Sequence, residues 1–248
     1  MMATPPAVPE RSPATVFLDG FNTALRSVFF YVLLGNYAGI GALAHEFGFS
    51  VGWMVLCTLL IWAAPAQVIL ISTLGSATLF EVALAVSLSS VRLLPMVAAL
   101  LPMLKRADTR QRDLLLPMHF TAISVWVEGM RLLPTCPREE RIAYYNGLGT
   151  GLMLAAALAS AGGYYLAAVL PALLAAALLF FTPMAILFVS ARNSRMLVDR
   201  LAFALGLAIW PIVAAGKIGL ELMWTGLIAG SIAYVVHRLR ERKGTAMP

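Results

Sequence analysis

Long apolar runs alternate with short polar segments along most of the 248 residues of this chain. A helix that crosses the hydrocarbon core of a bilayer needs about 20 predominantly apolar residues. Runs that reach or approach this length lie at about 25–44, 51–74, 82–104, 142–166, 167–190, 201–215 and 218–236. The pattern predicts an all-α fold, a polytopic membrane bundle of about seven transmembrane helices.

One further apolar stretch, residues 115–130, is short and polar along one side. At 100° per residue, one face of this stretch holds Thr121, Ser124, Glu128 and Arg131, and His119 lies on the opposite face. We expect a re-entrant or interfacial segment rather than a span. Glu128 and His119 are candidate carriers of coupling protons. The alternative is a structural pair of Glu128 with Arg131 at the membrane edge.

Two neighbouring runs within residues 52–102 contain features that a lipid-facing helix avoids. The first run holds Pro65 and Gln67, and the second holds Arg92 after a serine cluster that ends at Ser90. A charged side chain in the hydrocarbon costs roughly 3 kcal/mol on insertion scales. A proline removes a backbone hydrogen bond that lipid cannot replace. This hairpin, with its Pro-broken helix, is therefore expected to border a translocation pathway.

Arg92 is the strongest candidate for solute binding, because a guanidinium can hold a carboxylate through two hydrogen bonds. It lies about ten residues into its run, which is deep for a side chain that only snorkels to the interface. The alternatives are snorkelling and a structural ion pair with an acid. Gln67 and Ser90 are less specific polar candidates in the same hairpin.

Small residues recur at a spacing of four in three of the runs, a pattern typical of helices whose backbones pack closely. Gly35 and Gly39 flank Asn36, which is a candidate for substrate binding or for an interhelical hydrogen bond. Gly226 and Gly230 form another pair. The longest ladder, which predicts close helix packing, comprises Gly147, Gly151, Ala155, Ala159 and Gly163.

Composition agrees with a membrane protein, because 60% of the residues are hydrophobic and only 12% are charged. An ordinary soluble domain has about 25% charged residues. The net charge of +6 lies mostly in short basic clusters between the runs, so it does not indicate nucleic-acid binding. Cytoplasmic loops are enriched in Lys and Arg, and this rule favours an outside N-terminus and an inside C-terminus.

The domain organisation follows from these runs. Residues 1–20 are polar and Pro-rich, lack the features of a secretory signal, and are expected to form a mobile tail. Residues 21–238 are expected to form a single transmembrane domain. Residues 239–248 are expected to form a basic cytoplasmic tail.

No catalytic motif is present: the sequence has no HExxH, no GxSxG, no P-loop and no Rossmann glycine set. An enzyme, a metal site and a cofactor are therefore not expected, and the three histidines are far apart in the sequence. Cys57 lies in an apolar run and Cys136 in a basic loop, so two free thiols are expected.

A weak internal repeat aligns residues 59–72 with residues 177–190, so that Pro65 falls on Pro183 and Trp62 on Phe180. Corresponding Pro-interrupted helices in two halves of a chain indicate a transporter site at a repeat interface. Chance similarity between two apolar runs is the alternative.

Several segments together resemble the AzlC-type branched-chain amino acid exporters, the LIV-E family. These are LGNYAGIGALAHEFG (34–48), AAPAQ (63–67), SSVRLLP (89–95), and the order of a short polar-hydrophobic segment, a Gly-rich span and a Pro-bearing span. Many relatives have Asn-x-Arg-His where this chain has Ser90-Val91-Arg92-Leu93, and an acidic pair where it has HFTAIS (119–124). The chain is therefore similar to a divergent branch.

The resemblance implies the large subunit of a two-component permease in a bacterial inner membrane, working with a small AzlD-type membrane subunit. The expected substrate is a branched-chain or similar neutral amino acid. Its carboxylate would meet Arg92 and its aliphatic side chain would lie near Trp62, beside Pro65. Proton coupling is expected because the chain has no nucleotide-binding motif. The alternatives are a non-transporting assembly subunit and a transporter of another small solute.

Overall fold

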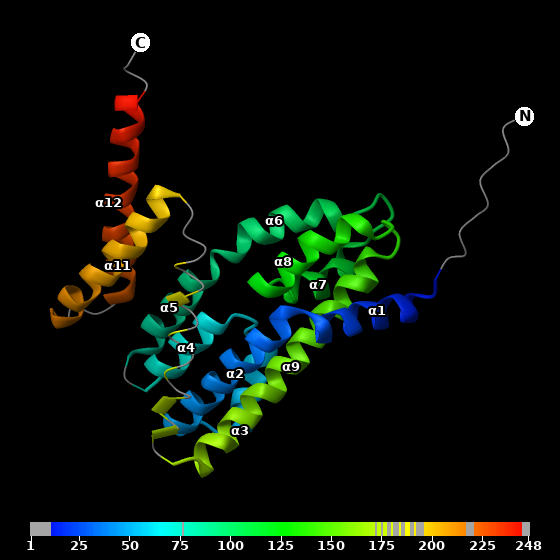
Figure 1. Cartoon of the computed structure of the whole chain (residues 1–248), viewed down its shortest axis with the longest axis horizontal. Coiled ribbons are helices and arrows are strands. Elements are labelled where there is room, and N and C mark those ends of the chain that lie inside the picture. Colours follow the sequence, from blue (N-terminus) through cyan, green and yellow to red (C-terminus); the bar gives the residue numbers. More distant parts are fainter. Residues whose placement is uncertain are drawn as a thin grey trace, which may run out of the picture.

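The computed structural model describes residues 11–75, 77–171, 196–216 and 221–244, with single positions between 173 and 191. The described elements are all helices (Figure 1). They are α1 (Pro13–Arg26), α2 (Val28–Glu46), α3 (Val51–Leu60), α4 (Ala64–Thr73), α5 (Leu79–Ser90), α6 (Leu93–Leu104), α7 (Gln111–His119), α8 (Ile123–Leu132), the 3₁₀ turn η1 (Leu133–Thr135), α9 (Arg141–Val169), α11 (Leu197–Ala215) and α12 (Glu221–Gly244).

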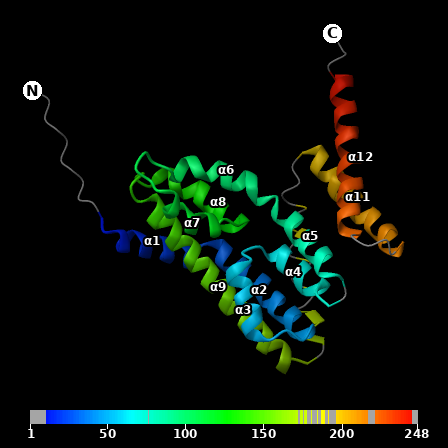
Figure 2. The same cartoon turned by 180° about the vertical axis from the view of Figure 1, so that it is seen from behind.

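The long helix α9 is the centre of the bundle, and α1, α2 and α3 lie along it in both views (Figures 1 and 2). Its glycines allow this close approach. A Cβ added at Gly147 would overlap the Phe17 carbonyl oxygen of α1, and one added at Gly163 would overlap the backbone of Ala38 in α2. The close packing predicted from the small-residue ladder is confirmed.

Residues 13–20, which the sequence assigned to an N-terminal tail, form the first part of helix α1 in the structure. Ser12 caps the helix by accepting from the Thr15 amide, and a proline in the first turn has a backbone suited to a helix start. Val16, Gly20 and Ala24 are buried at a spacing of four, so one narrow face packs on α9. Residues 1–10 of the expected tail lie outside the described residues.

The apolar runs are divided more often than expected. In the part of the chain that the structure describes, α2, α9 and α11 are long and apolar enough to cross a membrane. The pair α5–α6 makes a fourth candidate if its 42° bend lies within one span. The run at 51–74 is split into α3 and α4. The seven spans are thus not confirmed, because helix breaks divide two of the runs.

The segment 115–130 covers the end of α7 and most of α8, two short helices joined by a turn. With 9 and 10 residues, each has a length of about 15 Å, half the thickness of the hydrocarbon core. Neither helix could cross a bilayer alone. This division agrees with the expectation that the segment is not a simple span.

The C-terminal helices α11 and α12 pack mainly on each other and lie to one side of the bundle (Figure 1). Helix α12 continues to Gly244, past residue 239, where the basic tail was expected to begin. Residues 245–248 lie outside the described part. Eleven of the 24 residues of the run at 167–190 lie outside it too, including Pro183, so the internal repeat stays a prediction. Cys57 and Cys136 are free thiols, as expected.

Candidate functional site

The first helix break separates α3 from α4 at residues 61–63, and Pro65 explains it. A proline has no N–H to donate to the carbonyl four residues earlier, and its ring clashes with that carbonyl. The Ile61 carbonyl oxygen is therefore released from the helical pattern. It accepts instead from the Ala63 amide and from the Gln67 side-chain amide, each over 2.6 Å.

Gln67 is fully buried and belongs to a polar cluster behind this break. The Thr58 hydroxyl, also fully buried, lies 3.4 Å from the Gln67 Oε1 and 3.4 Å from the Ser160 hydroxyl of α9. The cluster joins α3, α4 and α9 through side chains that no lipid contacts. Gln67, a predicted substrate-binding residue, is thus placed behind the break and not on the cavity described next.

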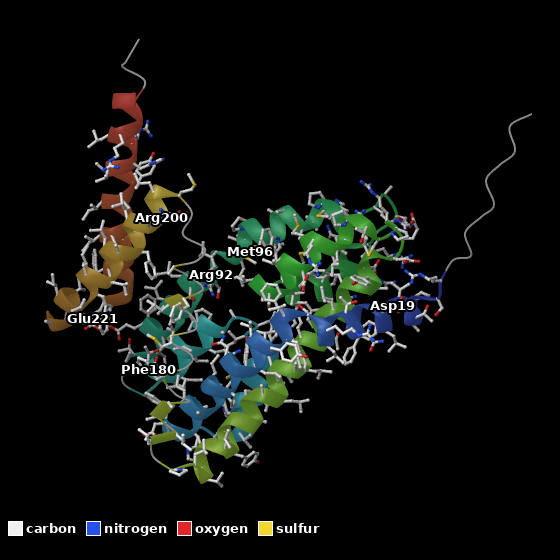
Figure 3. All side chains as sticks on the ribbon, in the orientation of Figure 1. Asp19, Arg92, Met96, Phe180, Arg200 and Glu221 are labelled. Carbon is white, nitrogen blue, oxygen red and sulfur yellow. The ribbon has the colours of Figure 1, made fainter. Side chains whose placement is uncertain are left out.

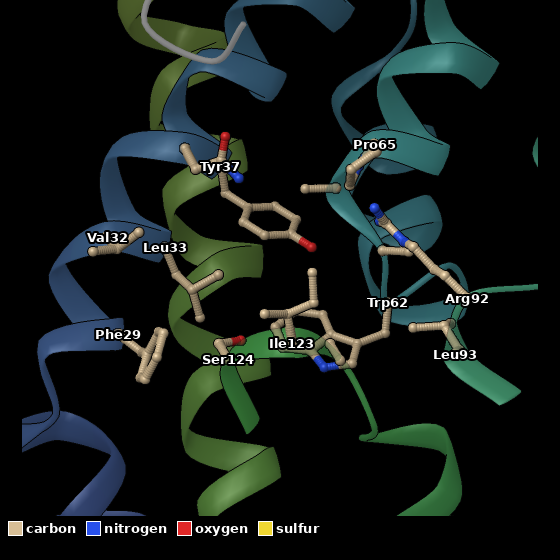
Figure 4. Close-up of a pocket in the computed structure, with 14 residues that line it drawn as sticks. Phe29, Val32, Leu33, Tyr37, Trp62, Pro65, Arg92, Leu93, Ile123 and Ser124 are labelled. Atoms are coloured by element: carbon tan, nitrogen blue, oxygen red, sulfur yellow. The ribbon is translucent and has the colours of Figure 1, made fainter. Parts of the chain in front are cut away.

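The second break separates α5 from α6 at Val91 and Arg92, where the helix axis bends by 42°. Arg92 lies at this junction (Figure 3) and directs its guanidinium into a cavity (Figure 4). The Ser90 hydroxyl donates to the Val86 carbonyl over 2.9 Å, a bond within its own helix. Ser90 is therefore near the bend but does not line the cavity.

The cavity lies between the two breaks, α2 and the start of α8, and has a volume of about 160 Å³ (Figure 4). Its lining residues that carry a polar side-chain atom are Asn36, Tyr37, Trp62, Arg92 and Ser124. Its apolar lining residues are Phe29, Val32, Leu33, Ala63, Ala64, Pro65, Leu93, Ala122 and Ile123. The structure thus brings four predicted residues, Asn36, Trp62, Pro65 and Arg92, to one cavity.

Two aromatic rings form one side of the cavity. Tyr37 and Trp62 stack with 5.7 Å between ring centroids and 20° between ring planes. The Trp62 Nε1 donates to the Phe120 carbonyl over 3.0 Å, which fixes the indole orientation. This arrangement presents a rigid apolar surface to whatever occupies the cavity.

Two hydrogen-bond donors on the cavity have no partner in the part of the chain that the structure describes. Neither the Arg92 guanidinium nor the Tyr37 hydroxyl makes a hydrogen bond or ion pair with any residue that the structure describes. Sequence reasoning missed Tyr37, although it directly follows the candidate Asn36 in an apolar run. The signal in the sequence was a tyrosine within an apolar run, because its buried hydroxyl needs a hydrogen-bond partner.

The two proposed proton carriers lie away from the cavity. The Glu128 carboxylate accepts from the Ser27 hydroxyl and from Arg131 Nε over 2.8 Å. The His119 Nε2 lies 2.8 Å from the Leu59 carbonyl oxygen. The pairing with Arg131 agrees with the structural alternative for Glu128. However, Glu128 is 5% exposed and lies one helical turn after Ser124, which lines the cavity.

The arrangement is suited to holding an anion beside an apolar group. No nucleophile with an adjacent base lines the described part of the cavity. Among the described residues, no group of three or more His, Cys, Asp or Glu side chains could hold a metal ion.

Comparison with known proteins gives one match. A family model described as AzlC protein matches residues 27–170. This range contains α2 to α9 and every described residue that lines the cavity. No curated protein and no solved structure matches the chain.

Proposed function

The chain belongs to the AzlC family, and from this premise we propose that it is the large subunit of a secondary exporter of branched-chain or similar neutral amino acids. The single observation that carries the proposal is the Arg92 guanidinium, which points into the cavity between two helix breaks (Figure 4). A cation in an apolar bundle is costly, so an arginine there with no acidic partner among the described residues favours an anionic ligand.

A carboxylate is the group that suits this guanidinium, because the two form parallel hydrogen bonds. The aliphatic side chain of the solute would then contact Trp62 and Leu33 on the apolar side. The cavity volume of about 160 Å³ is similar to that of an engineered apolar cavity that binds benzene. A branched aliphatic side chain has a comparable size.

Transport is proposed to use the proton gradient, because the sequence has no nucleotide-binding motif. Glu128 and His119 are the proposed proton carriers. Glu128 is the better supported candidate, since it lies on the same helix as the cavity residue Ser124. A proton on its carboxylate would weaken the bond with Arg131 at one end of α8.

A small AzlD-type membrane subunit is the proposed partner, and a bacterial inner membrane the proposed location. A purely structural assembly role is less well supported. The small-residue ladder that would favour such a role is occupied within the chain, by α1 at Gly147 and by α2 at Gly163.

Efflux from cells tests the proposal. A strain that lacks this protein is loaded with a leucine-containing dipeptide and should retain leucine until the intact gene is supplied. The Arg92→Ala protein should fail to restore efflux, whereas Arg112→Ala, which changes an exposed arginine in the first turn of α7, should restore it. Full efflux with Arg92→Ala at matched protein levels would reject the proposal.

A further inference from the structure

Tyr37 adds a second donor to the cavity. Its side chain is 2% exposed, its hydroxyl has no partner among the described residues, and that hydroxyl points into the cavity (Figure 4). A buried hydroxyl without a hydrogen bond is unfavourable. A bound acceptor would remove this penalty.

The N-terminal end of α4 is a third feature of the cavity that favours an anion. Ala63, Ala64 and Pro65 line the cavity, and no side chain caps the first turn of this ten-residue helix. The N-terminal end of a helix carries unpaired N–H groups and a partial positive charge. In transporters with broken helices, such ends point at anionic groups of the substrate.

The described lining of the cavity contains no carboxylate. The acid next along α8, Glu128, is already held by Arg131 and Ser27. An ammonium group in the cavity would therefore lose hydration without gaining an ion pair, and would lie near the Arg92 cation. The charges favour the carboxylate end of an amino acid and disfavour its ammonium end.

We infer that the cavity recognises its solute through the carboxylate alone and binds deaminated apolar monocarboxylates, such as the 2-oxo acid of leucine, at least as tightly as leucine. Arg92, Tyr37 and the first turn of α4 bind the carboxylate, and the stacked Tyr37 and Trp62 rings bind the aliphatic chain. This inference rests on the proposed function, since both take Arg92 as the anchor of the solute.

Calorimetric titration of the purified full chain tests the inference with three probes of similar shape. These are L-leucine, 4-methyl-2-oxopentanoate and the amine 3-methylbutylamine. The oxo acid should bind at least as tightly as leucine, and the amine should not bind. Tyr37→Phe keeps the ring stack and should weaken binding of both acids by about tenfold, the effect of losing one hydrogen bond to a charged group.

Tyr165→Phe is the matched control, because Tyr165 is 59% exposed on α9, and this variant should bind as the unmodified chain does. Leucine bound more tightly than the oxo acid, beyond the error of the titration, would overturn the inference and leave the proposed function intact. An unchanged affinity in Tyr37→Phe would also overturn it. Failure of all three probes to bind would reject both.

Discussion

The Gln67 side-chain amide donates a hydrogen bond to the Ile61 carbonyl oxygen over 2.6 Å, across the break between α3 and α4. Pro65 lies between them and cannot supply the backbone donor that a continuous helix would use. The glutamine thus replaces a lost backbone bond in an apolar bundle. This makes Gln67 a structural support of the cavity, whose lining it does not join.

Replacing Gln67 with leucine should therefore lower stability more than it changes the cavity lining. The expected loss is roughly 1–3 kcal/mol, the cost of leaving a buried polar group without its partner. Chemical unfolding in mixed micelles measures it. The control is Gln111→Leu, an exposed position in α7, which should unfold as the unmodified chain does. Equal stability of both variants would mean that the Ile61 carbonyl does not need the amide.

Gly163 and its neighbour Gly162 provide a test of the packing on α9. A Cβ at Gly163 would overlap the Ala38 backbone, whereas one at Gly162 would meet open space. Gly163→Ala should thus destabilise the chain by about 1–3 kcal/mol or more through overpacking. Gly162→Ala should be neutral or stabilising by up to about 1 kcal/mol, because alanine favours helix. The midpoints of thermal unfolding compare the two, and a similar loss in both would contradict the predicted contact.

Much of this arrangement could be predicted from the sequence, because its signals are local. Pro65 breaks a helix through its own ring, and Arg92 is conspicuous in an apolar run. Glycines four residues apart lie on one helix face, which is sufficient to predict the packing on α9. The location of Asn36, Trp62, Pro65 and Arg92 on one cavity agrees with a shared site, and their binding roles stay predictions.

Other features depend on geometry that periodicity does not specify. A helix break changes the direction of every later side chain, so the sequence did not reveal that Gln67 turns back to Ile61. It also did not reveal that Tyr37 of α2 stacks on Trp62, which lies in the break between α3 and α4. Helix α1 was missed because its apolar face is only one residue wide in each turn, within a Pro-rich polar context.

The ion pair between Arg11 and Glu140, which holds the start of α1 beside the start of α9, should stabilise this contact in a pH-dependent way. Arg11 donates to Glu140 through two nitrogens, and this hydrogen bond and charge lower the pKa of the Glu140 carboxyl below its usual value. In an undocked α1 the carboxyl would keep its ordinary pKa of about 4.3. The stabilisation is therefore complete above that value and is lost as the pH falls through the lower, docked pKa.

Hydrogen exchange of the α1 amides, measured between pH 7 and pH 3 and corrected for intrinsic rates, should show this loss of protection. Glu140→Gln cannot titrate at this position, so its α1 protection should be lower at pH 7 and nearly constant with pH. The same pH dependence in both proteins would assign the effect to another group.

Glu128 and Arg131 allow the coupling role to be separated from a structural one. The Glu128 side chain is 7% exposed and that of Arg131 is 64% exposed, with 2.7 Å between Glu128 Oε2 and an Arg131 guanidinium nitrogen. If the carboxyl carries a proton, Glu128→Gln should reduce gradient-driven efflux to the background level. The same variant should preserve exchange of labelled for unlabelled leucine across a proteoliposome membrane, because exchange requires no net proton movement.

Arg131→Gln keeps the carboxyl and should retain gradient-driven efflux. If both variants instead lose efflux and exchange to the same extent, the pair only holds α8 in place, and the proton must be carried elsewhere.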